Sequence, residues 1–361
     1  MEKYYPVVIA GGGPAGSACA KALSDQGINA LVLERQPLPR HKCCSGVLMG
    51  QTQELLKKYF GGLPPESVYC KPKIINSKNI IGWTEKDGYF VYEWEIPKDG
   101  KAFSSDFLNI WRNKFDHWLL TQSGAIVKER SSFAGFSIDD DKLKIDVKQG
   151  GTKTQLECSY LVGADGGDSL VRNAFDPSFK ERLNDLVVYQ VYYKCLDSGE
   201  FKEGSWNIFL GVIGDCLASI HKKDDLLTLV VGAFRMKGGL KGLMKDFEDL
   251  LSDRFKMKLS DKVRSEGTAM NDMFLRGDFC FGGGRVLLAG EAAGLFYLNG
   301  EGISVAIDSG YRAGSAIARA IKGKVSAYDL YSSEIDDIKR HVGLCASRQT
   351  LIMGPPQGGP A

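Results

Sequence analysis

Three glycines near the start of the chain stand at the spacing of a dinucleotide-binding turn. They are Gly11, Gly13 and Gly16, in the pattern Gly-x-Gly-x-x-Gly. In this pattern the first glycine permits a tight turn, the second leaves room for a pyrophosphate, and the third lets a helix pack closely on a strand. Glu34 follows about 20 residues later, where an acidic side chain typically binds a ribose hydroxyl. These residues predict a dinucleotide site with phosphates at a helix N-terminus.

A second group of reactive side chains lies in residues 39–46, which read Pro-Arg-His-Lys-Cys-Cys-Ser-Gly. The basic side chains there would stabilise a neighbouring thiolate and make the thiol more reactive. We therefore predict His41, Lys42 and Cys44 as catalytic candidates, with Cys44 able to donate a proton or to form a transient adduct. The alternatives are that Cys43 and Cys44 are buried packing residues, and that His41 contacts phosphate or solvent instead of acting as an acid or base.

The elements that must position these residues alternate between strand and helix. Residues 6–10 and 29–34 are apolar runs typical of buried strands, and residues 14–26 between them have helical spacing. This is the β-α-β unit of a parallel sheet. The later patterns predict helices at about 49–59, 106–123, 239–255 and 302–321, a short strand at 285–288, and strand-rich segments at 66–104, 125–162 and 186–234.

Two later segments also place a carboxylate beside a glycine after a strand. Residues 163–166 read Gly-Ala-Asp-Gly, and residues 285–294 run from an apolar strand into Gly-Glu-Ala-Ala-Gly. Gly-Glu-Gly-Ile follows at 300–303 and leads into a long helix rich in small residues. A carboxylate in this setting can bind sugar or ribityl hydroxyls, and the helix N-terminus can face a flavin ring or a pyrophosphate.

In order and spacing, these three segments resemble the FAD-binding motifs of class A flavoprotein monooxygenases and their relatives, among them the geranylgeranyl reductase family. That family's Gly-Glu/Asp-Ala-Ala-Gly and Gly-Glu-Gly-Ile are matched at 290–294 and 300–303. Its Arg before Phe-Asp-x-x-Leu is matched by Arg112 and residues 115–119. Its Pro-x-x-Lys-x-Cys-Gly-Gly is matched at 39–46, with Ser45 in place of a glycine.

The resemblance implies non-covalent FAD, with Glu34 on the adenosine ribose and Asp165 supporting a backbone turn near FAD. It implies that Glu291 lies near the ribityl chain or pyrophosphate, and that Arg112 reaches toward FAD. The alternative for Arg112 is an ion pair on a helix surface. The predicted cofactor-binding residues are Gly11, Gly13, Pro14, Ala15, Gly16, Glu34, Arg35, Cys44, Ser45, Gly46, Arg112, Asp165, Gly290, Glu291, Gly300, Gly302 and Ile303.

We expect an α/β fold, in which a three-layer FAD-binding Rossmann-like domain carries an inserted antiparallel β-sheet substrate domain. The segments predicted for the FAD-binding domain are 1–65, 105–180 and 270–325. Those predicted for the substrate domain are 66–104 and 181–269, and residues 326–361 are expected to form a C-terminal helix and a disordered tail. The active site is expected where the two domains meet.

Three functions follow from these motifs as hypotheses. The first, favoured by the resemblance, is a reductase or dehydrogenase in which reduced FAD gives hydride to a C=C bond of an apolar, isoprenoid-like substrate. The second is a class A monooxygenase that hydroxylates an aromatic substrate through a C4a-hydroperoxide, and the third is a non-catalytic electron-relay protein. The stretch 204–210 lacks the Tyr and Pro of the reductase family's Tyr-x-Trp-x-Phe-Pro segment, which leaves the substrate open.

The composition restricts the choice of partners. The 361 residues include 46 basic and 44 acidic side chains, a balance that gives no reason to expect nucleic acid. No second glycine motif is visible for a reductant, so we expect NAD(P)H to bind transiently or a small redox protein to serve. The nine cysteines lack disulfide or metal-site spacing. With neither a leader nor a membrane-spanning run predicted, we expect a cytoplasmic protein and leave peripheral membrane contact open.

Overall fold

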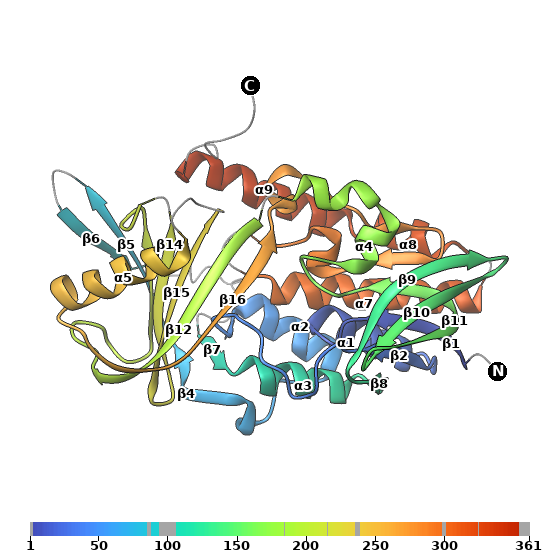
Figure 1. Ribbon diagram of the computed structural model, residues 1–361, viewed down its shortest axis with the longest axis horizontal. Helices are drawn as coiled ribbons and strands as arrows, with labels where there is room; N and C mark the ends of the chain where they lie inside the picture. The colour runs from blue at the N-terminus through green and yellow to red at the C-terminus, as the bar shows by residue number, and fades with distance from the viewer. Residues whose placement is uncertain are drawn as a thin grey trace.

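The computed structural model describes residues 3–84, 88–93, 106–183, 185–214, 216–234, 239–297, 301–323 and 325–353. Predicted site residue Gly300 and the predicted tail 354–361 therefore lie outside the described residues. Figure 1 shows an elongated molecule with a helix-rich part around one sheet and a second sheet beside it. In the described part of the chain, no helix combines the length and apolar character needed to cross a membrane.

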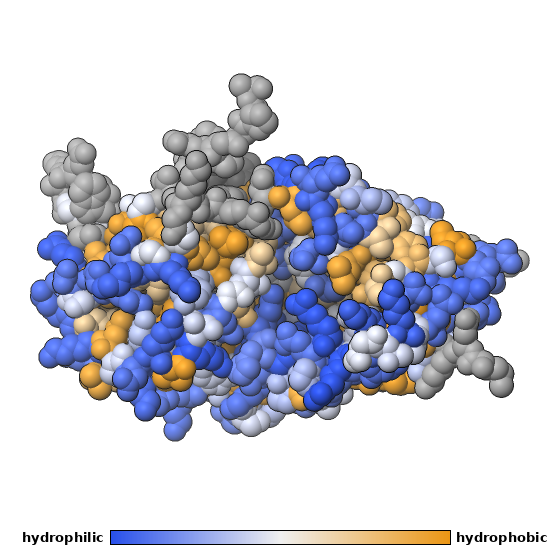
Figure 2. Space-filling view, viewed as in Figure 1, coloured by the Kyte–Doolittle hydropathy of each residue, from blue (hydrophilic) through white to orange (hydrophobic). Residues whose placement is uncertain are grey.

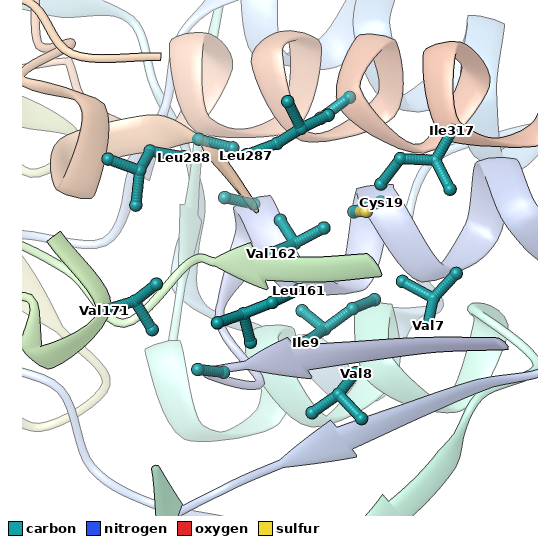
Figure 3. Close-up of a cluster of buried hydrophobic side chains, with 14 of the residues drawn as sticks. Val7, Val8, Ile9, Cys19, Leu161, Val162, Val171, Leu287, Leu288 and Ile317 are labelled. Atoms are coloured by element: carbon teal, nitrogen blue, oxygen red, sulfur yellow. The ribbon is translucent and has the colours of Figure 1, made fainter. Parts of the chain in front are cut away.

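A parallel sheet forms the centre of the helix-rich part. Its five parallel strands have the order β18-β11-β1-β2-β8, and β2, β18 and the carboxyl-terminal part of β1 are buried apolar runs of the kind that sheets covered on both faces require. Their bounds are β1 (Lys3–Ala10), β2 (Ala30–Leu33), β8 (Ile126–Lys128), β11 (Thr152–Gly163) and β18 (Val286–Leu288). Figure 3 shows side chains of β1, β11 and β18 packed with Cys19 and Ile317 from the helices above them.

Helices and an antiparallel meander complete three layers around this sheet. Helix α1 (Pro14–Ser24) packs against α7 (Ile303–Lys322), and the fit depends on Gly310, whose Cβ would lie 2.1 Å from the Ala15 carbonyl oxygen. On the sheet's far side, β9 (Ser131–Asp139) and β10 (Lys142–Gln149) extend from β11, and β17 (Gly282–Gly283) pairs with β18. The other helices are α2 (Gly50–Phe60), α3 (Arg112–Gln122), α4 (Leu170–Phe175), α6 (Met273–Arg276), α8 (Ala327–Glu334) and α9 (Asp336–Met353).

The second sheet is mostly antiparallel, with one parallel pair, β13–β5. Its order is β16-β12-β15-β14-β13-β5-β6, and α5 (Leu240–Phe255) packs on one face through an apolar core. The strand bounds are β5 (Ser77–Thr84), β6 (Gly88–Glu93), β12 (Asp185–Asp197), β13 (Ser205–Leu210), β14 (Leu217–Lys223), β15 (Leu226–Phe234) and β16 (Lys258–Asn271). The expected α/β fold with a separate, mainly antiparallel sheet is thus confirmed.

A small sheet joins the two parts, and it corrects one prediction. Strand β7 (Phe107–Ile110) pairs with β3 (Val47–Leu48) and β4 (Tyr69–Ile75), so the helix predicted over 106–123 begins only at Arg112. The apolar side chains at 107, 108 and 110 fit a helix by spacing, but pairing on both sides buries all three in a strand. Tertiary context therefore outweighs local periodicity here.

Candidate functional site

Of the three motif glycines around the start of α1, packing requires Gly11 and Gly16 but not Gly13. A Cβ on Gly11 would lie 2.4 Å from the Ala164 carbonyl oxygen, and one on Gly16 would lie 1.9 Å from the Gly11 carbonyl oxygen. A Cβ on Gly13 would meet only Arg40 Nη2, at 3.4 Å. Gly13 precedes α1 and offers no side-chain cap, so the N–H groups of the first turn are available for an anionic group.

Glu34 lies at the carboxyl end of β2, directly beside this turn. Its side chain is nearly fully buried and accepts hydrogen bonds from Gly12 N at 3.1 Å and Gln36 N at 3.0 Å. Arg40 Nε also donates to Glu34 Oε2, at 3.0 Å. The predicted carboxylate is therefore at the edge of the glycine turn, while the side chain of Arg35, also predicted, is exposed.

A buried chain of charges leads from Glu34 toward the cysteine loop. Arg40 Nη1 donates to Asp116 Oδ2 at 3.0 Å, and Arg112 binds the same carboxylate through Nε at 2.8 Å and Nη2 at 2.9 Å. Burial alone would raise the pKa of Asp116, but the two guanidinium groups hold that pKa below its usual range. Arg112 is thus in an ion pair, as the alternative reading held, but the pair is buried and extends into the site.

The two cysteines of the loop differ in their surroundings. Cys43 is buried with its sulfur 3.8 Å from Gln190 Oε1, and burial, followed by the charge of Glu266, raises the pKa of Cys43 to about 12. Cys44 is half-buried, accepts a hydrogen bond from Gly46 N at 3.4 Å, and interacts with the Arg112 guanidinium. Cys43 is therefore a packing residue, whereas Cys44 lies beside a fixed positive charge.

The second sheet holds the backbone of this loop. Gln190 donates to the Cys44 carbonyl at 3.4 Å, and His221 Nε2 lies 3.0 Å from the Ser45 carbonyl oxygen, so Nε2 must carry the proton. At Gly46, which has a φ of 68°, a Cβ would lie 2.8 Å from Lys223 Nζ. These contacts of the second sheet with Cys44, Ser45 and Gly46 hold the backbone of the loop in place.

The neutral state of His221 predicts a pH dependence of stability. Burial, with the charge of Lys223 acting in the same direction, lowers the pKa of His221 to about 3. In the unfolded chain His221 takes up a proton below about pH 6.5, whereas in the folded protein it stays neutral down to about pH 3. The stability that neutral His221 contributes is therefore complete above about pH 6.5 and is lost as the pH falls toward 3. Between pH 8 and pH 5, urea unfolding of the wild type should therefore lose about 2 kcal/mol more than that of His221→Gln. His117→Gln, at an exposed position on α3, should lose as much stability between pH 8 and pH 5 as the wild type. An equal loss in all three proteins would contradict a neutral, buried His221 in the folded state.

Among the described residues, the remaining predicted ones lie at the same end of the parallel sheet. Gly290 has a φ of 62°, and its Cβ would lie 3.2 Å from Ala15 and 3.3 Å from Ala306, at the point where α1, α7 and η3 (Gly290–Ala293) meet. The three glycine segments, far apart in the sequence, therefore lie together. Helix α7 starts after Gly302 without a side-chain cap, and the first helical residue, Ile303, is buried.

The two later carboxylates have different local roles. Asp165 accepts hydrogen bonds from Ser169 Oγ at 2.5 Å and Leu170 N at 2.8 Å, and so fixes the start of α4 against the glycine turn. Glu291 accepts from Asn271 N at 3.3 Å. Desolvation raises the pKa of Glu291, while the charges of Lys42 and Arg112 oppose that rise.

A pocket lies where the loop, α3 and the second sheet meet. It has an empty volume of about 220 Å³, including its open mouth, and its lining brings together the catalytic candidates His41, Lys42 and Cys44. The other lining residues are Ile110, Trp111, Arg112, Asn113, Tyr192, Lys223 and Arg264. Of these the motifs identified only Arg112. Arg40 and Asp116 lie within the matched motifs at 39–46 and 115–119, but neither was predicted as a site residue. The i,i+4 spacing of opposite charges was a further local signal for Asp116.

These residues fit an FAD molecule. Two long helices, α1 and α7, begin beside Gly290 without side-chain caps, which leaves backbone donors for phosphates and for the polar edge of a flavin. The space beside Gly13 is open, and Glu34 lies where a ribose hydroxyl would need a carboxylate. An extended dinucleotide could thus contact all three segments.

Comparisons with known proteins agree with this geometry. A family model described as the FAD binding domain matches residues 4–64 and 108–212. An uncharacterized protein of Methanosarcina barkeri is 27% identical over 333 residues, which cover 90% of this chain and 77% of that protein.

Two solved structures share the fold. A geranylgeranyl bacteriochlorophyll reductase-like protein from Thermoplasma acidophilum superposes with a TM-score of 0.77 at 19% identity, covering 97% of this chain and 87% of that one. The myxobacterial chondrochloren halogenase CndH, described as a variant of FAD-dependent halogenases, gives a TM-score of 0.77 at 18% identity, covering 97% and 82%. At 19% and 18% identity, these superpositions show that the fold is shared.

Proposed function

We propose that this chain, in which residues 4–64 and 108–212 match an FAD binding domain, is an FAD-dependent oxidoreductase that reduces a C=C bond of an apolar substrate. In the proposed arrangement, Glu34 holds the adenosine ribose and the N-terminus of α1 at Gly13 receives the phosphates. Glu291 and the N-terminus of α7 hold the ribityl and flavin end. Once reduced, the bound FAD supplies the hydride.

The observation that carries this proposal is the position of Cys44. Cys44 is half-buried, lines the pocket and interacts with the Arg112 guanidinium. Hydride addition to one alkene carbon requires a proton at the other, and the Cys44 thiol is placed to give it. The sulfur then takes its next proton from solvent. The double bond is thereby reduced by one hydride and one proton.

The second sheet offers an apolar surface next to this pocket, and we propose segments 66–104 and 181–269 as the substrate domain. On the face that carries Gln190, the neighbouring row of the sheet is Val188, Gly232 and Leu217. Lys42 Nζ lies 3.5 Å from Thr268, which pairs with Val188, so this row adjoins the loop. Figure 2 shows hydrophobic side chains gathered over this sheet around β14 and β15. Such a face suits an apolar chain.

The test uses anaerobic holoenzyme whose flavin has been reduced with dithionite, mixed with a panel of prenyl alcohols. Mass spectrometry should find products that have gained two hydrogens. Cys44→Ala should slow this step by roughly 10²–10⁴-fold, the usual contribution of a general acid. Cys43→Ala, at the buried neighbour, should retain most of the rate. Equal rates for Cys44→Ala and the wild type would exclude Cys44 as the acid.

Hydroxylation of an aromatic substrate is the second candidate. The rings of Trp111 and Tyr192 favour it, because both line the pocket, with their centroids 5.8 Å apart. Aromatic side chains of this kind can pack against a flat aromatic ligand. The same reduced holoenzyme, mixed with oxygen and a panel of phenols, distinguishes the two functions. Oxygen consumption with a product that gains one oxygen atom would favour hydroxylation over alkene reduction.

A further inference from the structure

The pocket beside Cys44 is lined by basic side chains from four separate segments. Lys42 comes from the loop, Arg112 from the first turn of α3, Lys223 from the end of β14, and Arg264 from β16. His41 lies at the same mouth. Among the described residues that line the pocket there is no Asp or Glu. Such a convergence of cations in one small cavity favours an anionic occupant.

The carboxylates nearest to the pocket already have partners. Asp116 is shared between Arg112 and Arg40. Glu266 accepts a hydrogen bond from the Tyr192 hydroxyl at 2.9 Å and lies 4.0 Å from Arg264 Nη2, at the limit of an ion pair. Asp224, which accepts a hydrogen bond from Trp111 Nε1 at 2.7 Å, also acts on Lys223, and Glu291 acts on Lys42 and Arg112. These carboxylates lie behind the cations and do not line the pocket, so a ligand inside it would meet the basic side chains directly.

Arg264 is held by stacking, and one of its donors, Nε, has no partner in the described part of the chain. The guanidinium stacks over the Tyr192 ring, 4.2 Å from its centroid, and lies 5.7 Å from that of Trp111. Its Nη1 is 3.1 Å from His41 Nδ1, and its buried Nε has no hydrogen-bond partner within the described part of the chain. Stacking fixes the plane of an arginine while its N–H groups stay in that plane, the geometry that binds phosphate or carboxylate in a bidentate manner.

Lys223 adds a buried cation to the wall of the pocket. It is almost inaccessible to solvent, and Nζ donates to Asn109 Oδ1 at 3.0 Å and to the Ile110 carbonyl. Desolvation lowers its pKa, partly opposed by Cys70, Cys44 and Asp224, while neutral His221 lies on the same strand. A negatively charged ligand in the pocket would offset the cost of burying this ammonium.

We propose that this pocket is an anion-binding subsite that holds a phosphate or carboxylate group of a small molecule while FAD is bound. The basic side chains line the pocket itself, and the apolar part of a substrate would continue along the sheet face at Val188. The anion belongs either to the substrate or to the phosphates of a nicotinamide coenzyme. Only the substrate assignment rests on the proposed alkene reduction.

Equilibrium dialysis of labelled pyrophosphate against FAD-saturated holoenzyme tests the subsite without any turnover. The wild type should bind pyrophosphate saturably, and Arg264→Gln should weaken binding at least tenfold. Lys262→Gln is the matched control, because Lys262 lies on the same strand and contacts Tyr189 OH, at 3.1 Å, away from the pocket. Absence of saturable binding, or equal affinity in the two variants, would overturn the proposal. So would binding only to FAD-free protein, since the pocket would then belong to FAD.

Two kinetic arms identify the source of the anion. If it is the coenzyme, Arg264→Gln should raise at least tenfold the NADH or NADPH concentration that half-saturates flavin reduction. If it is the substrate, the same variant should raise the half-saturating concentration of a prenyl phosphate, but not of the matching prenyl alcohol, for the dithionite-reduced enzyme. No effect in either arm would overturn a functional role for the pocket. Failure of alkene reduction alone would leave the dialysis result and the coenzyme arm standing.

Discussion

Replacing Gly13 by alanine is expected to give a folded protein that no longer holds FAD. The backbone at Gly13, with φ of −85° and ψ of −171°, is open to any residue, and the new Cβ would meet only Arg40 Nη2 at 3.4 Å. In the proposed complex, however, this methyl group occupies the space of the pyrophosphate. We expect FAD affinity to fall roughly a hundredfold or more, about 2.8 kcal/mol.

Two further glycine variants separate this binding defect from a folding defect. In Gly16→Ala the Cβ would lie 1.9 Å from the backbone oxygen of Gly11, so β1 and α1 must move apart and the free energy of unfolding should fall. Gly62→Ala, with nothing within 4 Å, should be neutral. Bound flavin absorbance, FAD titration by fluorescence and circular dichroism measure the three cases. A Gly13→Ala protein that purifies yellow with wild-type affinity would refute the placement of the phosphates.

The meeting of the three glycine segments could be predicted because its signals are local. A positive φ at Gly11 and Gly290, and close packing at Gly16, each require glycine at a single position. A carboxylate such as Glu34 then follows a strand end. Each of these motifs is short, and parallel strands bring their carboxyl ends to one edge, so order and spacing along the chain were enough.

The buried charge chain could not be predicted in the same way. Arg40 and Asp116 are 76 residues apart, and neither position has a pattern that names the other. The basic run at 40–42 suggested activation of a thiol, yet Arg40 turns away to Glu34 and Asp116, and Arg112 from another helix interacts with Cys44. Only the fold decides which cation reaches the sulfur.

The contacts between the second sheet and the loop at residues 39–46 could not be predicted from the sequence either. In alternating strands such as β14, a buried polar residue looks like a surface residue until the partner of that face is known. His221 and Lys223 are two residues apart, so they share the face that meets Ser45 and Gly46. Strand β7 illustrates the same limit, because its pairing partners come from segments distant in the chain.

Replacing Asp116 by asparagine is expected to cause the largest loss of stability among single polar substitutions in the site. The carboxylate is 1% exposed and binds both Arg40 and Arg112, so its removal leaves two guanidinium groups in a largely buried place without their counter-charge. Breaking a buried ion pair by removing one partner typically costs about 3–5 kcal/mol. Urea unfolding at pH 7 should show a loss in this range.

Asp139→Asn provides the matched control, because Asp139 pairs with Lys144 at 2.8 Å on an exposed strand end and should matter little. The pH dependence adds an independent check. The pKa of Asp116 is lowered in the folded protein, so its contribution is complete above the unfolded value near 3.8 and is lost as the pH falls through the folded value. The gap between wild type and Asp116→Asn should therefore narrow at acidic pH. If both asparagine variants unfold at the same urea concentration at pH 7, the buried charge chain does not stabilise the site, and Arg112 cannot owe its place beside Cys44 to Asp116.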